Sequence, residues 1–179
     1  AQRDAIAATT GDSVFNSTTG RIEVYGGTAW QGRVGVLHVS TTSQATTGTS
    51  EEVLATYTLP ANTLSANGKA IRITVAFSHA PNTNLAGISL KCGGIGGTSI
   101  IGPLSAASNA KGRIVAEVFR TGATTQKYGA SSTWGAVAIA ASGTAALTLS
   151  NAIDIVVTGT TATNAGDVTL DWWIVEALN

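Results

Sequence analysis

Two histidines and one cysteine are the side chains of this 179-residue chain best suited to acid–base, nucleophilic or metal chemistry. His38 falls in the apolar run G-V-L-H-V-S, which predicts a structural strand histidine, and His79 falls in S-H-A-P-N, which predicts a solvated loop histidine. A Ser-His-Asp site needs a histidine base and a turn that exposes the serine, and the sequence has no G-x-S-x-G turn. No catalytic residue is therefore assigned.

Metal and cofactor chemistry find no better support in the sequence. Cys92 stands alone in L-K-C-G-G, where a small buried hydrophobe is expected rather than a reactive thiol. Two isolated histidines, one cysteine and no Asp/Asn cluster at calcium-loop spacing provide no ligand set. Residues 93–97, G-G-I-G-G, lack the G-x-G-x-x-G spacing of a phosphate-binding loop. We expect no metal and no cofactor.

Carboxylates are the remaining catalytic candidates. A glycosidase needs two of them across a cleft. Glu117, Asp154, Asp171 and Glu176 lie within or near the ends of expected strands, and among ten acidic residues such pairs arise by chance. The chain is therefore expected not to be an enzyme.

Aromatic residues suit a contact surface better than a reaction. Trp134 follows a polar loop, Tyr128 lies in an alternating segment, and Trp172 and Trp173 are adjacent. Adjacent strand residues point to opposite faces; the alternation of Val168 and Ile174 with Trp172 predicts Trp172 in the core and Trp173 outside. An exposed Trp either seals a subunit interface or stacks on a sugar, and a neighbouring loop that covers it is the structural alternative.

The candidate contact residues are accordingly Trp134, Tyr128 and Trp173, with a subunit interface favoured over a glycan site.

These residues must be positioned by strands. Thr, Val, Ile and Gly are abundant, and the first three fit a pleated, half-buried surface. The segment 70–77 alternates with a period of two, which places Ile71, Ile73, Val75 and Phe77 on one face. Residues 53–59 alternate as well, and we expect these two strands to pair. The composition and about eight to ten such segments predict an all-β sandwich or barrel.

Net charge and hydrophobic runs exclude several partners. Ten basic and ten acidic residues give a net charge of zero, so nucleic acid is not an expected partner. No stretch approaches the ~20 apolar residues of a membrane helix, and the N-terminus lacks the pattern of a signal peptide. A surface with only 11% charged residues is poorly protected against self-association, which fits subunit contacts.

The segment from Arg3 to Trp30 reads as two short strands around the turn S-T-T-G, a β-hairpin. Its pattern R-D-A-I…G-D-S-V-F-N-S-T-T-G-R-I-E-V-Y-G-G-T-A-W resembles a small module of bacteriophage fibre and other virion proteins. The resemblance implies an attachment or assembly arm, with Phe15, Tyr25 and Trp30 as its candidate contact residues.

The remaining chain carries a second resemblance. The stretches T-L-P-A-N-T-L-S-A-N-G-K and R-T-G-A-T-T-Q-K, with the final E-A-L-N, are similar to a jelly-roll domain of tailed-phage virion proteins. This resemblance covers residues 51–179 and implies a homotrimer. We therefore expect an arm at 1–40, a linker at 41–50 and an antiparallel jelly-roll sandwich at 51–179.

Together the two resemblances imply a non-enzymatic structural protein of the phage virion surface, assembled in the host cytoplasm. It would be a trimeric knob, either a capsid decoration or a short head or tail fibre, in contact with other virion proteins. The alternative is a carbohydrate-binding fibre tip that reads a host surface glycan.

Overall fold

The alternating segments form β-strands throughout the computed structural model, which describes residues 7–16, 21–25, 30–32, 35–106, 110–135 and 137–178. Fourteen strands pair antiparallel in three sheets. The sheet nearest the N-terminus contains β1 (Ser13–Asn16), β2 (Arg21–Tyr25) and β3 (Trp30–Gly32).

Two further sheets form the body of the molecule. The seven-stranded sheet runs in the spatial order β12 (Val137–Ala145), β11 (Thr125–Trp134), β10 (Lys111–Gly122), β7 (Ala70–His79), β14 (Val168–Ala177) and β4 (Gly35–Ser40), with the short β5 (Gln44–Ala45) also paired to β14. The four-stranded sheet runs in the order β6 (Glu52–Leu59), β13 (Ile153–Thr161), β8 (Ala86–Cys92) and β9 (Thr98–Ala106).

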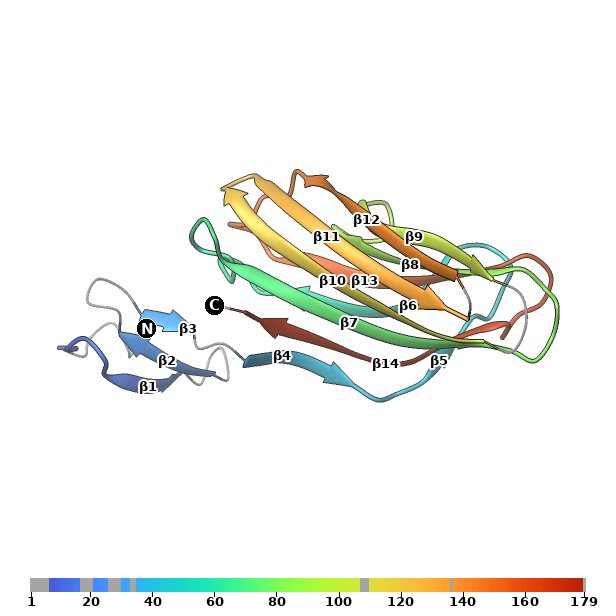
Figure 1. Cartoon of the computed structure of the whole chain (residues 1–179). Coiled ribbons are helices and arrows are strands. Elements are labelled where there is room, and N and C mark those ends of the chain that lie inside the picture. The colour runs from blue at the N-terminus through green and yellow to red at the C-terminus, as the bar shows by residue number, and fades with distance from the viewer. Residues whose placement is uncertain are drawn as a thin grey trace.

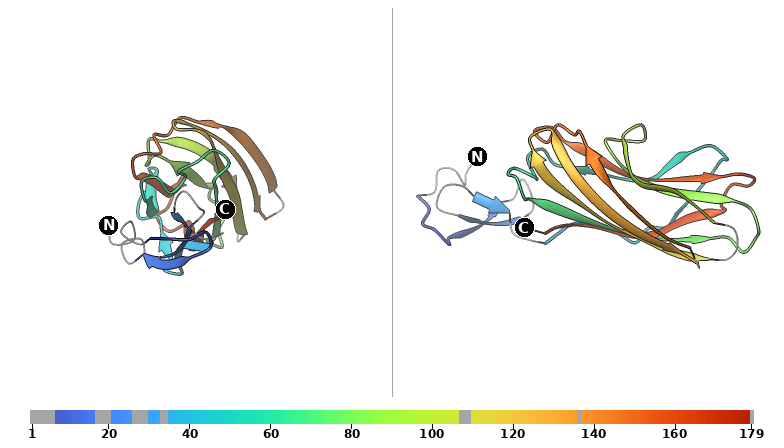
Figure 2. Two further views of the ribbon diagram at one scale, coloured as in Figure 1. Left: turned by 90° about the vertical axis from the view of Figure 1, so that its left-hand side faces the viewer. Right: turned by 45° about the horizontal axis from the view of Figure 1, so that its top comes forward.

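These two sheets face one another (Figures 1 and 2). The side chains between them form one shared apolar core. Strand β7 contributes its predicted inward face to this core, with all four residues at most 1% exposed: Ile71, Ile73, Val75 and Phe77. The opposite sheet contributes Leu90, Ile155 and Val157, each 0% exposed. Burying each such side chain stabilises the fold by about 1.5–3 kcal/mol. The prediction of an all-β, antiparallel sandwich is confirmed.

The predicted pairing of β6 with β7 is wrong. Strand β6 pairs with β13 in the smaller sheet, whereas β7 lies between β10 and β14 in the larger one. The connection at 60–69 therefore crosses from one sheet to the other, and Gly68 within it donates its backbone N–H to Arg120 O. Period-two alternation defines which face of a strand is buried but not which strand lies beside it, so a pairing of consecutive strands does not follow from it.

The N-terminal hairpin is present, and the chain after it differs from the predicted organisation. Strands β1 and β2 pair from Ser13↔Val24 to Asn16↔Arg21, and β3 extends the hairpin to three strands. Strand β4, expected in the arm, and β5, expected in the linker, both pair with β14 of the main sheet. Without the segment 35–45, one edge of β14 would be unpaired. Strands β4 and β5 satisfy the backbone groups along that edge. In Figure 1 the three-stranded sheet projects from one end of the sandwich, near the C-terminal end of β14.

Candidate functional site

The side of the seven-stranded sheet turned away from the core is open, and we call it the outer face. By the strand registers it carries Val36, Val39, Arg72, Thr74, Ala76, Arg113, Val115, Glu117, Phe119, Trp172, Ile174 and Glu176. One row across the strands contains Val39, Ile174, Thr74 and Val115, so three of the four side chains at the centre of the face are apolar. A largely apolar face with charged borders suits contact with another macromolecule.

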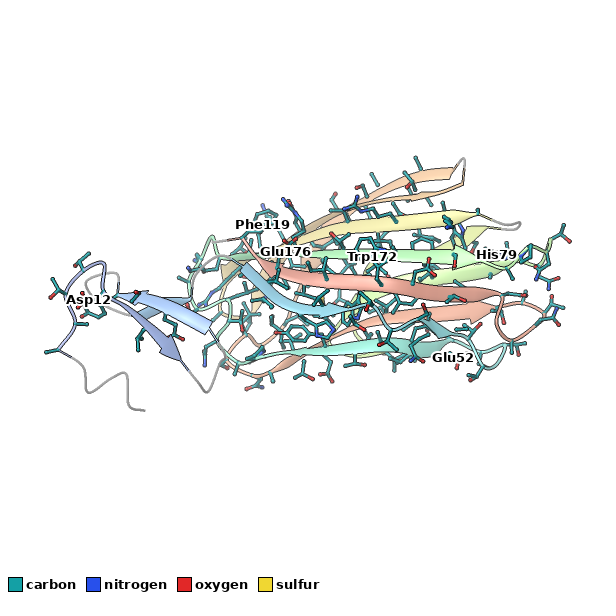
Figure 3. The ribbon with its side chains drawn as sticks, turned by 90° about the horizontal axis from the view of Figure 1, so that it is seen from below. Asp12, Glu52, His79, Phe119, Trp172 and Glu176 are labelled. Atoms are coloured by element: carbon teal, nitrogen blue, oxygen red, sulfur yellow. The ribbon has the colours of Figure 1, made fainter. Side chains whose placement is uncertain are left out.

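The tryptophan pair on β14 takes the reverse of its predicted orientation. Leu170 pairs with Phe77 and Trp172 with Ala76, so Asp171 is an extra residue that forms a β-bulge. A bulge shifts the alternation by one residue. Trp173 is consequently buried at 1% exposure, and Trp172 lies on the outer face at 39% exposure, along the same strand as Glu176 (Figure 3).

Trp173 is therefore a core residue, and its predicted role as a contact residue is wrong. Its indole meets the His38 ring edge-on, with a centroid separation of 4.8 Å, and that ring stacks on Tyr57 at 4.9 Å. His38 is thus a structural strand histidine, as predicted. Burial lowers the pKa of His38 and favours the neutral ring.

Trp134 and Tyr128 also point inward from β11. Trp134 is 2% exposed, packs edge-on against Phe77 at 4.9 Å and donates its Nε1–H to Ala110 O at 3.3 Å. Tyr128 is half-buried over Gly143, the position opposite it on β12, where an added Cβ would come within 2.5 Å of the phenol oxygen. The three predicted contact residues therefore do not gather at one surface, and Trp134 is unavailable to a ligand.

The arm residues are placed only in part. The backbones of Phe15 and Trp30 lie in β1 and β3, and their side chains are outside the described part of the chain. Tyr25 is half-buried on β2, directly opposite Trp30. Its backbone N–H donates to Asp12 O at 2.8 Å and its carbonyl accepts from the Gly11 N–H at 2.9 Å, which closes the hairpin.

The predicted acidic candidates are spread over both sheets. Glu117 accepts from the Arg72 guanidinium at 2.7 Å on the outer face. Asp171 accepts from the Ser78 hydroxyl at 3.0 Å, whereas Asp154, on the smaller sheet, accepts from the Thr58 hydroxyl at 2.6 Å. Among the described residues, no group of three His, Cys, Asp or Glu side chains is placed to hold a metal ion.

His79 is the centre of a buried polar network at the end of the sandwich away from the arm (Figure 3), and its prediction as a solvated loop residue is wrong. The ring is 3% exposed, with Nδ1 2.6 Å from Ala80 O and Nε2 2.8 Å from Asn84 O. The loop carbonyls fold back over the imidazole because they need a donor once buried. An imidazolium donates to both oxygens, whereas a neutral ring donates to only one.

Asp167 lies in the loop before β14. Its carboxylate binds two side chains of the loop that folds over His79. Its carboxylate accepts from the Asn82 amide at 2.7 Å and from the Asn84 amide at 2.9 Å. The hydrogen bond from Asn82 is the main cause that holds the pKa of Asp167 below its ordinary value, with Asn84 and the charge of His79 adding to it and burial opposing it. The network therefore positions a loop rather than a reacting group.

Cys92 is buried in the core, as predicted. Burial raises the pKa of its thiol to about 12, so the reactive thiolate is suppressed.

Among the described residues, no helix is long and apolar enough to cross a membrane.

The sequence reasoning missed Trp172, Val36 and Val39 as surface residues. The run from Gly35 to Ser40 has apolar side chains on both faces, and in a strand packed on one side only that pattern indicates an exposed apolar face. This signal was present in the sequence. The bulge that exposes Trp172 has no comparable sequence signal.

The proteins of known structure that are similar to this chain are distant from it. No protein family model and no curated protein matches the chain. The family resemblance therefore rests on the motifs alone.

Three solved structures are weakly similar to this chain. The sugar-binding C-terminal domain of EclA is 14% identical with a TM-score of 0.42, covering 76% of this chain and 78% of that one. The Shewanella oneidensis MR-1 protein SO2946, of unknown function, is 10% identical with a TM-score of 0.35, covering 98% of this chain and 91% of that one. The infectious bursal disease virus Gx strain structure is 13% identical with a TM-score of 0.32, covering 83% and 33%. With TM-scores this low, none of them carries a functional argument.

Proposed function

We propose that this chain is a non-enzymatic structural protein of a phage virion surface, a homotrimeric knob anchored through its N-terminal sheet. The observation that carries the proposal is the separate three-stranded sheet, which projects from one end of a sandwich that has its own complete core. A unit well under about 40 residues is usually too small to hold a stable core alone, and it gains stability against another surface.

Three features of the body support a structural role over a catalytic one. Both nitrogens of His79 are engaged by backbone carbonyls, the His38 ring lies between two aromatic rings, and the Cys92 thiol is buried. The two histidines and the cysteine are thus committed to the fold. The motifs at 3–30 and 51–179, which resemble phage virion modules, supply the proposed location as a capsid decoration or a short head or tail fibre.

The test is the position of the protein on the particle. Immunogold electron microscopy would use antibodies against the recombinant chain on particles of the phage whose genome encodes it. The antibodies should label the particle surface. Label on the head would indicate decoration, and label at the tail would indicate a fibre. Particles that lack the chain by labelling and by mass spectrometry would overturn the proposal.

Carbohydrate binding is the second candidate, and Trp172 favours it. Its indole is 39% exposed beside the hydrogen-bonded Ser78–Asp171 pair, and an exposed ring next to polar side chains suits stacking on a sugar. A glycan array probed with the intact chain and with Trp172→Ala would test this role. Selective binding that the substitution abolishes would favour a fibre tip; a uniformly blank array would leave the structural role.

A further inference from the structure

Large apolar side chains concentrate on the outer face. Eight such residues are exposed in the described chain, and four of them lie on this one face: Val36 at 55%, Val39 at 60%, Phe119 at 38% and Trp172 at 39%. They come from three strands, β4, β14 and β10, that are far apart in sequence. Val36, Val39 and Trp172 adjoin Ile174 in one apolar area, whereas Phe119 lies beyond the row of Glu176, Arg72 and Glu117. An exposed apolar area of this kind on a folded protein marks a contact surface.

The apolar row is bordered by charges of opposite sign that lack ion pairs within the chain. Glu176 lies directly across from Arg72, but the guanidinium of Arg72 is bound to Glu117 on its other side. On the opposite border, Arg113 shares a row with Ala76 and Trp172. Among the described residues, neither Glu176 nor Arg113 has an ion-pair partner.

The spacing of these two charges suits a contact between copies. They are separated by four residues along the strands, about 13 Å, and by two strand spacings, about 10 Å, which is too far for them to pair within one chain. Two other charged residues, Asp171 and Lys111, flank Ser78 on neighbouring strands, and Lys127 lies next to Phe119 at the far end of the face.

We propose that the outer face is the contact between copies of this chain, in which the Glu176 border of one copy meets the Arg113 border of the next. The apolar row of Val39 and Ile174 is buried between them. This inference rests on the proposed oligomeric knob and assigns its interface. A ring requires each copy to present its Glu176 border to one neighbour and its Arg113 border to the other, which is a heterologous contact. If the same two copies exchanged both contacts, the contact would be isologous and the assembly a dimer. Opposite charges at the borders set the register of the contact and disfavour other arrangements.

Charge reversal tests the assignment directly. Light scattering and sedimentation velocity on the full chain at about 0.05 M salt, where screening is weak, would compare Glu176→Lys, Arg113→Glu and the double variant. Each single reversal should raise the dissociation constant of the oligomer at least about tenfold, because like charges then meet across the contact. The double variant should recover most of that loss, because the pair is re-formed with its signs exchanged.

A matched valine pair provides the control. Val39→Glu, on the edge strand of the larger sheet, should dissociate the oligomer, whereas Val53→Glu, on the edge strand β6 of the smaller sheet at 42% exposure, should leave its mass unchanged. An unchanged melting temperature of the dissociated protomer would confirm that the fold survives.

The outcomes separate this inference from the proposed function. A wild-type oligomer whose mass responds to neither charge reversal nor Val39→Glu would overturn the interface and leave the virion role standing. Loss of the oligomer with no recovery in the double variant would overturn the Glu176–Arg113 contact. A monomeric wild type would overturn the interface together with the oligomeric knob, and a glycan bound at Trp172 to an unchanged monomer would identify the face as a sugar site instead.

Discussion

Trp173 fills the core beneath β4, where its indole contacts the His38 ring and is almost completely removed from water. Truncating a buried tryptophan to alanine removes its transfer free energy and leaves a cavity, at a cost of about 3–5 kcal/mol. We expect Trp173→Ala to lower the free energy of unfolding by that amount. Trp172→Ala, on the outer face, should change it by less than about 1 kcal/mol. Denaturant unfolding of both variants as protomers provides the comparison, and equal losses would contradict the bulge at Asp171.

The lowered pKa of Asp167 predicts that the loop held by its carboxylate loses stability in acid. Its pKa is lower in the folded chain than its ordinary value of 3.8, so its contribution to stability is fully present above that value. The contribution is lost as the pH falls through the lowered, folded-state pKa. Asp167→Asn should therefore reduce Tm at pH 7 and show a shallower fall in Tm between pH 5 and pH 2 than the wild type. Parallel pH profiles for the two proteins would contradict this role.

Gly112 on β10 tests how tightly the core is packed. A Cβ there would lie within 2.4 Å of the Phe77 ring and 2.9 Å from Thr133 O, so Gly112→Ala forces the aromatic ring to move. Overpacking of this kind costs about 1–3 kcal/mol. Gly129, on the neighbouring β11, has no atom within 4 Å of an added Cβ, and Gly129→Ala should be neutral or slightly stabilising. Thermal unfolding of the pair checks both expectations.

At the scale of elements, β4 belongs to the sandwich although it follows the arm in sequence. It covers one edge of β14 and places His38 between Tyr57 and Trp173. We expect a chain that begins at residue 35 to fold with a Tm within a few degrees of the full chain, because its sheets and core are intact.

A chain that begins at residue 41 should be markedly less stable and prone to aggregate, because β14 would expose unpaired backbone groups. Circular dichroism melts and solubility of the two truncations give the measurement. Equal stability of the two would show that β4 contributes little to the sandwich. Loss of particle labelling in the first truncation, with its fold retained, would support the arm as the anchor.

At the scale of the whole molecule, the proposed trimer predicts a specific mass. The chain is 18.0 kDa, so light scattering after gel filtration should give about three times that value at micromolar concentration. The open apolar face supplies surface that a monomer would leave in water. The mass should fall towards that of one chain on dilution, and a single-chain mass at every concentration would contradict the trimer.

The sequence by itself determined the fold class, the inward face of β7, the N-terminal hairpin and the burial of Cys92. Each of these depends on local information: side chains alternate with a period of two in any strand, and β-branched residues favour strands whatever their neighbours are. The hairpin is local too, since its turn joins two adjacent segments.

Tertiary structure alone decided the rest. The partners of β6 and β7, and the pairing of β4 with the last strand, depend on contacts between residues far apart in the sequence, from 33 positions for Ser78 and Lys111 to 142 for Gly35 and Ala177, which alternation does not encode. One bulged residue, Asp171, exchanged the faces of Trp172 and Trp173, and the burial of His79 required a loop to fold back over it. A candidate site built from face assignments is therefore sensitive to a single register shift, because one extra residue moves every later side chain of the strand to the opposite face.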